Sequence, residues 1–271
     1  MSNIDKAGEK YWTSVWNDSD LPEAINPDSK RLQNFVISKI HYAFSTFFES
    51  QDTKGKSIIE IGCGNSVWLP YLHKSFGLQI NGLDYSAIGC EKTRAILKRE
   101  GVSGNIVEGD LFNPPVDMIG KFDFVISLGV VEHFTDTAGT LEKMKAFLKP
   151  GGIMITEIPN LTGLNGFLLK HTDKEIYNIH KPSDKDQLAD YHTAAGMKVL
   201  SSYYLNVASI LINYNSSPDL SFLVLKKVLV GFISRILKIT WLWERITGIS
   251  FPRTKFFSPF VFVYAKKEKA L

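Results

Sequence analysis

Short apolar runs alternate with helical stretches between residues 56 and 158, and this alternation constrains the fold more than any other feature of the sequence. The runs are SIIEIGC, LQINGLD, GNIVEGD, FDFVISL and GGIMITEI. Helices are expected between them near residues 67–76, 86–99 and 138–148. Strands joined by helices at this spacing form right-handed βαβ units. The sequence therefore predicts an α/β fold with a mostly parallel sheet and helices on both faces.

Segments outside this alternation complete the expected organisation. Residues 1–55 are predicted to form an N-terminal helical and aromatic lid, and residues 56–206 the core. Residues 207–257 are predicted to be a helical insertion, acting as a substrate cap or a dimer contact, with an apolar helix near 220–245. Residues 258–271 are predicted to supply the final edge strand and basic tail of the core.

Local signals place several element boundaries in the flanking segments. Asn26-Pro27-Asp28 is typical of a helix start. A loop rich in Asn, Gly and His is expected over residues 159–182. It is followed by a predicted helix over 184–195, which Ser183 would cap.

Two glycines after the first predicted strand form the most informative turn. Gly62 and Gly64 let the backbone turn tightly and approach a ligand with no Cβ in the way. They lie at the carboxyl end of a strand, where open α/β sheets bind ligands. A dinucleotide fingerprint would require a third glycine at the position of Val67, so pyrophosphate binding is disfavoured.

Acids end the next two apolar runs. Asp84 follows the second run and can accept two hydrogen bonds from a ribose diol. Asp110 follows the third run, where it can accept from an exocyclic adenine amine while Leu111 covers the base. Three neighbouring strand tips are therefore expected to form one adenosine site.

The motifs EIGCGNS, GLDYS, EGDLF, FDFVISLGVVEHF and FLKPGG, in this order over about residues 56–158, resemble those of class I S-adenosylmethionine (SAM) dependent methyltransferases. The resemblance implies a Rossmann-like, seven-stranded sheet and SAM as cofactor. Ser66 stands where many members have a third glycine. The cofactor-binding residues that the resemblance implies are Glu60, Gly62, Cys63, Gly64, Asp84, Tyr85, Asp110, Leu111, Ser127 and Leu128.

Aromatic residues near the N-terminus extend the resemblance. Tyr11, Trp12 and Trp16 resemble the segment that folds over SAM in several small-molecule methyltransferases. Aromatic faces attract a sulfonium as they attract an ammonium, and a lid excludes water. Packing in the protein core is the alternative interpretation, and the sequence leaves both open.

His133 is the residue best placed to act as a catalytic base, because it follows the fourth predicted strand. An oxygen nucleophile would need such a base. The alternative is that His133 braces the next helix. Glu132-His133 also resembles the metal site of ubiquinone-pathway O-methyltransferases, but Gly129 stands where that site has a further carboxylate. We therefore expect no metal.

Other polar side chains have weaker assignments. His171, Tyr177 and His180 fall in the loop after the fifth strand, where such folds build the substrate wall, although loop histidines are often only solvated. The thiols of Cys63 and Cys90 show no pairing pattern and are expected to be small apolar filler.

The composition bounds the remaining choices. With 44% hydrophobic and 22% charged residues, the chain is not disordered or collagen-like. Two cysteines are too few for a disulfide framework, and MSNIDKAGEKYW lacks the apolar stretch of a secretory signal, so a cytoplasmic location is expected. No segment is expected to span a membrane.

The positive charge is concentrated in the C-terminal fifth. Residues 220–271 carry 10 Lys and Arg against Glu244 and Glu268, a balance of +8, which leaves −5 for the remainder. The apolar helix near 220–245 is interpreted as a lid over a hydrophobic pocket, a homodimer contact or a helix resting weakly on a membrane surface. The absence of a base-reading motif disfavours nucleic acid.

These observations predict a SAM-dependent methyltransferase acting on a small-molecule acceptor, with oxygen favoured as the nucleophile. An N-methyltransferase and an RNA or protein methyltransferase are alternatives within the class. A noncatalytic SAM-fold partner subunit and an NAD-dependent oxidoreductase are alternatives outside it. Asp84 and Asp110 argue against the partner subunit, and the missing third glycine argues against NAD.

Overall fold

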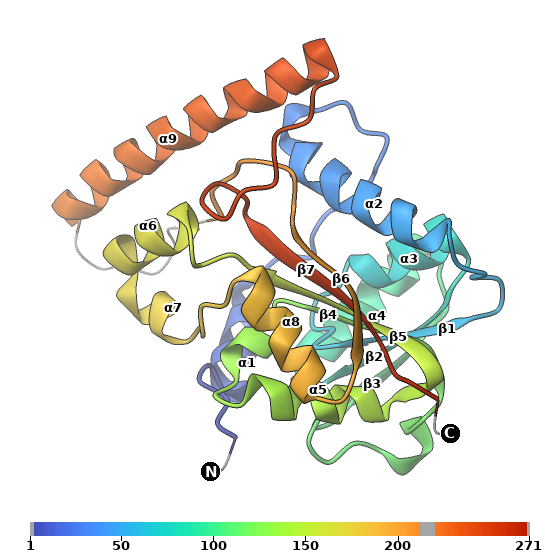
Figure 1. The fold of residues 1–271 in the computed structure, drawn as a ribbon. Helices are drawn as coiled ribbons and strands as arrows, with labels where there is room; N and C mark the ends of the chain where they lie inside the picture. The colour runs from blue at the N-terminus through green and yellow to red at the C-terminus, as the bar shows by residue number, and fades with distance from the viewer. Residues whose placement is uncertain (1–2, 212–219, 270–271) are drawn as a thin grey trace.

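The computed structural model describes residues 3–211 and 220–269, and within them seven strands form one sheet in the order β3-β2-β1-β4-β5-β7-β6 (Figure 1). β7 pairs antiparallel with both of its neighbours, and the other pairings are parallel. The predicted seven-stranded, mostly parallel sheet is confirmed. The strands are β1 (Ser57–Ile61), β2 (Gln79–Asp84), β3 (Asn105–Glu108), β4 (Phe122–Leu128), β5 (Leu148–Pro159), β6 (Lys198–Tyr204) and β7 (Phe260–Lys266).

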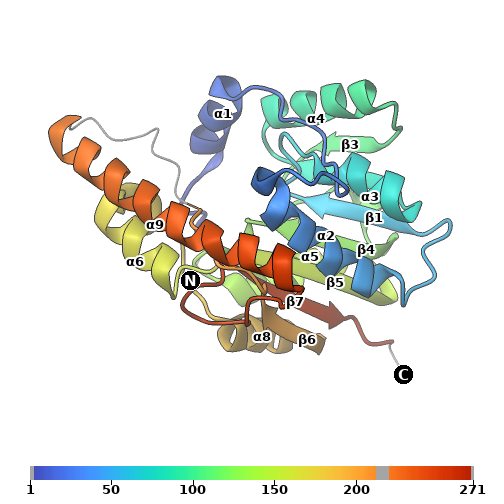
Figure 2. The same ribbon diagram turned by 90° about the horizontal axis from the view of Figure 1, so that it is seen from above.

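Helices cover both faces of this sheet, as the alternating pattern predicts (Figures 1 and 2). The expected core helices are found with ends shifted by one or two residues. The helices are α1 (Glu9–Asp18), α2 (Phe35–Phe48), α3 (Trp68–Phe76), α4 (Ala87–Glu100), α5 (Thr137–Ala146), α6 (Leu164–Thr172), α7 (Lys174–Asn178), α8 (Lys185–Ala194) and α9 (Leu220–Thr247).

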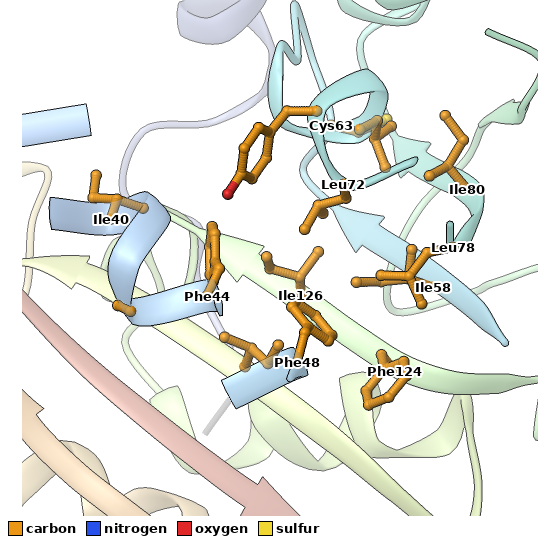
Figure 3. Close-up of a cluster of buried hydrophobic side chains, with 14 of the residues drawn as sticks. Ile40, Phe44, Phe48, Ile58, Cys63, Leu72, Leu78, Ile80, Phe124 and Ile126 are labelled. Carbon is orange, nitrogen blue, oxygen red and sulfur yellow. The ribbon is translucent and has the colours of Figure 1, made fainter. Parts of the chain in front are cut away.

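Alternation of side chains along the strands divides the core into two layers. Ile58 of β1 points to a layer that includes Phe44 and Phe48 of α2 and residues of α3 and α4 (Figure 3). Ile59 points to the opposite layer, which is completed by α5 and α8 and includes Met144. Burial of both faces explains why these strands read as continuous apolar runs.

The prediction that residues 258–271 supply an edge strand is wrong. β7 lies between β5 and β6, and β6 forms the edge. The burial of the side chains agrees with this strand order. Residues Val261 to Ala265 of the inner strand β7 are fully buried, whereas Leu200 of the edge strand β6 is exposed. Residues 212–219 of the predicted insertion, and residues 270–271 of the predicted tail, lie outside the described residues.

Three local predictions also need correction. Asn26-Pro27-Asp28 does not begin a helix, since α2 starts at Phe35 after a 3₁₀ turn. The N-cap of α8 is Asp184, not Ser183, because its carboxylate accepts from two backbone N–H groups and Gln187 completes a capping box. The predicted loop over 159–182 contains α6 and α7.

The helices α1 and α9 lie at the periphery of the fold, although Trp241 of α9 reaches the core layer that contains Phe44. α1 packs beside α4, and α9 runs across the outside of the molecule over α2 and α6 (Figures 1 and 2). Among the described residues, no helix has the length and apolar character needed to cross a bilayer.

Candidate active site

The carboxyl ends of β1 to β4 open into a cavity of about 560 Å³. Its walls also include the N-terminal segment and the stretch from Gly129 to Phe134 after β4. A cavity at the carboxyl edge of a parallel sheet is where this architecture binds ligands.

The glycine turn forms the floor of this cavity. Gly62 has φ of 77°, and its N–H donates to the Leu83 carbonyl at 2.8 Å. A Cβ on Gly62 would lie 2.5 Å from Val130 Cγ2, and one on Gly64 would lie 2.5 Å from Trp16 Nε1. Both positions therefore require glycine, one for its left-handed backbone and both for space.

Asp84 joins the turn to the second strand tip. Its Oδ2 accepts from the Gly64 N–H at 2.8 Å, and its Oδ1 accepts from the Ser86 N–H at 2.7 Å. Burial raises the pKa of Asp84, and these two backbone donors oppose the rise. The carboxylate is fixed at the cavity wall with lone pairs left for a ligand diol.

Glu60 lies deeper in the same wall. Burial raises its pKa to about 8, although the Ser66 hydroxyl, which donates to Oε2 at 2.5 Å, acts in the opposite direction. Ser66 Oγ also accepts from the N–H groups of Trp68 and Leu69, at the start of α3. Ser66 therefore links Glu60 to the start of α3 and places its side chain at the cavity.

The third strand tip supplies Asp110 and Leu111. Both line the cavity, where Leu111 is buried and Asp110 is exposed. One Asp110 oxygen accepts from the Phe112 N–H at 2.9 Å, which fixes the turn after β3. The three predicted tips therefore meet around one space.

Aromatic rings from α1 cover the cavity. Trp12 and Trp16 stack with centroids 5.5 Å apart, and both line it. Trp16 Nε1 is buried with no hydrogen-bond partner in the described part of the chain. An unpartnered donor beside the Asp84 acceptor fits a ligand that offers both donors and acceptors, as a ribose does.

His133 also lines the cavity, where its ring packs edge-to-face with Trp12 at a centroid distance of 5.2 Å. Its Nδ1 lies 3.0 Å from the Ile179 carbonyl, so this nitrogen carries the proton and Nε2 is the acceptor. Burial and the nearby His180 lower the pKa of His133 to about 4. The imidazole is neutral at pH 7.

A buried polar cluster adjoins His133. The ligand atoms of Glu132, His133 and His180 all lie within 4.8 Å of one another, an arrangement that could hold a divalent cation. His180 Nδ1 bonds the Ile176 carbonyl at 2.6 Å, which leaves its Nε2 free as an acceptor. Burial raises the pKa of Glu132 to about 8. The expectation of no metal was based on Gly129 and did not count His180.

Most residues assigned from the sequence line the cavity: Trp12, Trp16, Glu60, Gly62, Gly64, Asp84, Tyr85, Asp110, Leu111, Leu128 and His133. Cys63 and Ser127 are fully buried behind the wall, and Tyr11 packs against Trp12. The Cys63 side chain packs against Gly82 as apolar filler. His171 is exposed and bonds its own helix.

Several residues of the wall were not predicted. Asp5 reaches it because the N-terminal segment pairs with Phe134, and Asp5 accepts a 3.0 Å hydrogen bond from the Tyr85 hydroxyl. Trp68 begins α3 after the glycine turn, and Phe112 lies in the turn after β3, so their position beyond a strand tip was the signal available in the sequence.

The glycines and acids required by the resemblance surround one cavity at neighbouring strand tips, as class I SAM-dependent methyltransferases require. A family model described as "Methyltransferase domain" matches residues 29–220. The chain therefore belongs to the methyltransferase-domain family, and SAM is the cofactor of this class. The residues at Gly64, Trp16 and Asp84 fit that cofactor.

Two curated relatives illustrate the sequence similarity. A chloroplastic protein of Oryza sativa subsp. japonica, named probable tocopherol O-methyltransferase, is 26% identical over 152 residues, covering 53% of this chain and 42% of its own length. The ubiquinone biosynthesis O-methyltransferase of Chelativorans sp. is 32% identical over 109 residues, covering 40% and 42%. The match spans less than half of either relative.

A solved structure shows the same fold over nearly the whole chain. The geranyl diphosphate C-methyltransferase of Streptomyces coelicolor, in complex with Mg²⁺, geranyl diphosphate and S-adenosyl-L-homocysteine, has a TM-score of 0.58 and 12% identity. The comparison covers 96% of this chain and 97% of that one.

Proposed function

We propose that this protein transfers a methyl group from SAM to a small, largely apolar acceptor through an oxygen nucleophile. One observation carries the proposal. The glycine turn, Asp84 and the neutral His133 all line a single cavity. The relatives named for tocopherol and ubiquinone O-methylation support the same class of acceptor.

The residues of the cavity have separable roles in this reaction. SAM supplies a methyl group activated by a sulfonium leaving group. Asp84 would hold the ribose, Asp110 and Leu111 the adenine, and the Gly62 turn would admit the methionine end. Trp12 and Trp16 would exclude water and hold the reactants in line.

His133 would accept the proton of the acceptor hydroxyl at Nε2. The Ile179 carbonyl holds the Nδ1 proton, which fixes the tautomer required for this role. The low pKa of about 4 keeps Nε2 unprotonated at neutral pH. Leu128, Val130, Phe112 and Phe134 beside it favour an apolar acceptor.

A nitrogen acceptor is the nearest alternative, because a neutral amine attacks without a base. Replacing His133 separates an oxygen acceptor from a nitrogen acceptor, since only the oxygen acceptor needs proton removal before or during attack. We place the reaction in the cytoplasm, because Cys63 and Cys90 are free and buried.

The proposal is tested in two steps. Titration calorimetry with SAM, S-adenosylhomocysteine and NAD should show binding of the first two alone. A mass-spectrometric screen of host extract should then reveal a compound that gains one methyl group only when enzyme and SAM are both present. Binding of NAD in place of SAM, or SAM binding without any methylated product, would contradict the proposal.

A further inference from the structure

The inner face of α9 is fixed to the body of the protein. Trp241 is buried, stacks on Phe35 at 5.4 Å, and donates from Nε1 to the Ala208 carbonyl at 2.7 Å. Glu244 is buried in an ion pair with Lys39. With Val230 and Leu237, which are also buried, these side chains form a stripe at helical spacing. The helix is therefore held in one rotational setting.

The opposite face of α9 is apolar and exposed. Its members recur at intervals of three and four residues, so they form one continuous stripe. They are between 46% and 75% exposed. We call this surface the outer face of α9, and its residues are Leu229, Phe232, Ile236, Ile239, Trp243 and Ile246.

A run of large exposed side chains of this kind has no explanation in the fold or the active site. None of the described residues of α9 lines the cavity. The adjacent Val228 and Leu242 are also more than half exposed. Contiguous exposed apolar surface of this extent marks an interaction site.

The charged side chains around the outer face of α9 indicate what kind of partner covers this face. Arg235 is exposed and Lys238 half-buried at the border of the outer face. The acid in the helix, Glu244, is on the inner face and neutralised by Lys39. Residues 220–271 carry a balance of +8. A basic border around Phe, Trp, Ile and Leu is the pattern of a helix that lies in the interface of an anionic membrane.

Two other occupants fit less well. A second copy packed against the outer face would bring the Arg235 and Lys238 side chains of two helices together, with mutual repulsion. A bilayer-spanning arrangement is excluded for α9 by its charged and buried inner face.

We propose that the outer face of α9 docks this protein on an anionic lipid bilayer, with the helix parallel to the surface and Trp243 at headgroup depth. Arg235 and Lys238 contact lipid phosphates, and the inner face keeps its contacts with α2. The proposal does not depend on the identity of the methyl acceptor.

Co-sedimentation of the full chain with lipid vesicles tests the proposed docking of α9 on a bilayer. Phosphatidylcholine vesicles containing about a third phosphatidylglycerol should bind the protein at least about tenfold more tightly than pure phosphatidylcholine, and added salt should weaken that binding. Equal binding to both vesicles, or none to either, would overturn the proposal.

Matched variants locate the contact. Ile239→Glu should lower binding about tenfold or more, whereas Val116→Glu, at an even more exposed apolar position on another element, should leave it unchanged. The double variant Arg235→Gln, Lys238→Gln should reduce both the affinity and its salt dependence. Unfolding midpoints and SAM affinity should stay at the wild-type values, which separates this outcome from failure of the proposed function.

Tryptophan fluorescence reports the depth of the helix. Emission should shift to the blue on adding anionic vesicles, and Trp243→Phe should remove that shift without abolishing sedimentation. A shift that persists in Trp243→Phe would place the lipid contact elsewhere. Analytical ultracentrifugation showing a dimer that Ile239→Glu dissociates, without vesicle binding, would assign the face to a second copy instead.

Discussion

The Gly64 N–H donates to Asp84 Oδ2 at 2.8 Å, so the glycine turn after β1 and the carboxylate after β2 form one unit. A Cβ at Gly64 would lie 3.0 Å from the same oxygen. The ligand site is therefore already shaped by contacts between two strand tips, before any ligand contributes. This relationship makes Asp84 the position at which cofactor binding is most directly tested.

Asp84→Ala should weaken SAM binding by about 1 to 3 kcal/mol, or roughly 5-fold to 150-fold, through loss of hydrogen bonds to the ribose. Titration calorimetry measures the effect. Asp117→Ala, at an exposed carboxylate outside the cavity, is the matched control and should bind as the wild type does. Unchanged affinity in Asp84→Ala would remove this residue from the site.

Trp16→Phe should lower SAM affinity about tenfold without lowering thermal stability. The indole N–H is buried with no partner among the described residues, so its loss leaves no donor or acceptor unpaired in the unliganded protein. A bound cofactor would lose one hydrogen bond. Calorimetry and thermal unfolding together check this, with Trp243→Phe as the control outside the cavity. A large loss of stability with normal affinity would favour the core-packing interpretation of Trp16.

The parts of the site that could be predicted are those encoded by short stretches. Gly62, Gly64 and Asp84 lie next to apolar runs whose ends fix their position at the sheet edge. Register between neighbouring parallel strands then brings Asp84 and Asp110 together without further information.

The parts that could not be predicted depend on contacts between distant segments. His180 reaches His133 because the segment after α7 lies against the turn after β4, where the Lys181 N–H donates to the Glu132 carbonyl; the two imidazole centroids are 4.5 Å apart. Asp5 reaches the wall through pairing with Phe134. The place of β7 inside the sheet likewise depends on topology, which the apolar pattern of one strand does not specify. Asp184 and Ser183 are both good capping residues, so composition alone did not decide between them.

His133→Asn should reduce turnover about a hundredfold while the protein remains folded. The Asn side-chain amide can still donate to the Ile179 carbonyl, but the Nε2 acceptor is lost. The variant therefore distinguishes the two roles of His133, because it keeps the structural hydrogen bond and removes only the group that would act as the base. Because the pKa of His133 is about 4, the wild-type rate should not depend on protonation of this residue between about pH 6 and 8. His171→Asn is the exposed control, and full turnover in His133→Asn would leave His133 a brace.

The buried carboxyls should make the protein less stable as pH rises from about 6.5 to 8.5. Burial raises the pKa of Glu60 and Glu132 from 4.5 to about 8, so in this range the folded protein binds more protons than the unfolded chain. Their stabilising contribution is complete below pH 4.5 and is lost as pH rises through about 8. Burial lowers the pKa values of His133 and His192 to about 4. These two groups therefore make the stability rise with pH, but only below about pH 6.5.

Glu132→Gln should flatten this decline, because the amide resembles the protonated carboxyl and does not ionise. Denaturant unfolding midpoints at several pH values measure the slope, and Glu142→Gln at an exposed position should retain the wild-type slope. If Glu132 were ionised and paired with a cation held by His133 and His180, the wild type would instead lose stability on addition of a chelator. A wild-type midpoint that does not fall toward alkaline pH, together with sensitivity to chelator, would therefore assign the cluster to metal binding and contradict the prediction of protonated carboxyls.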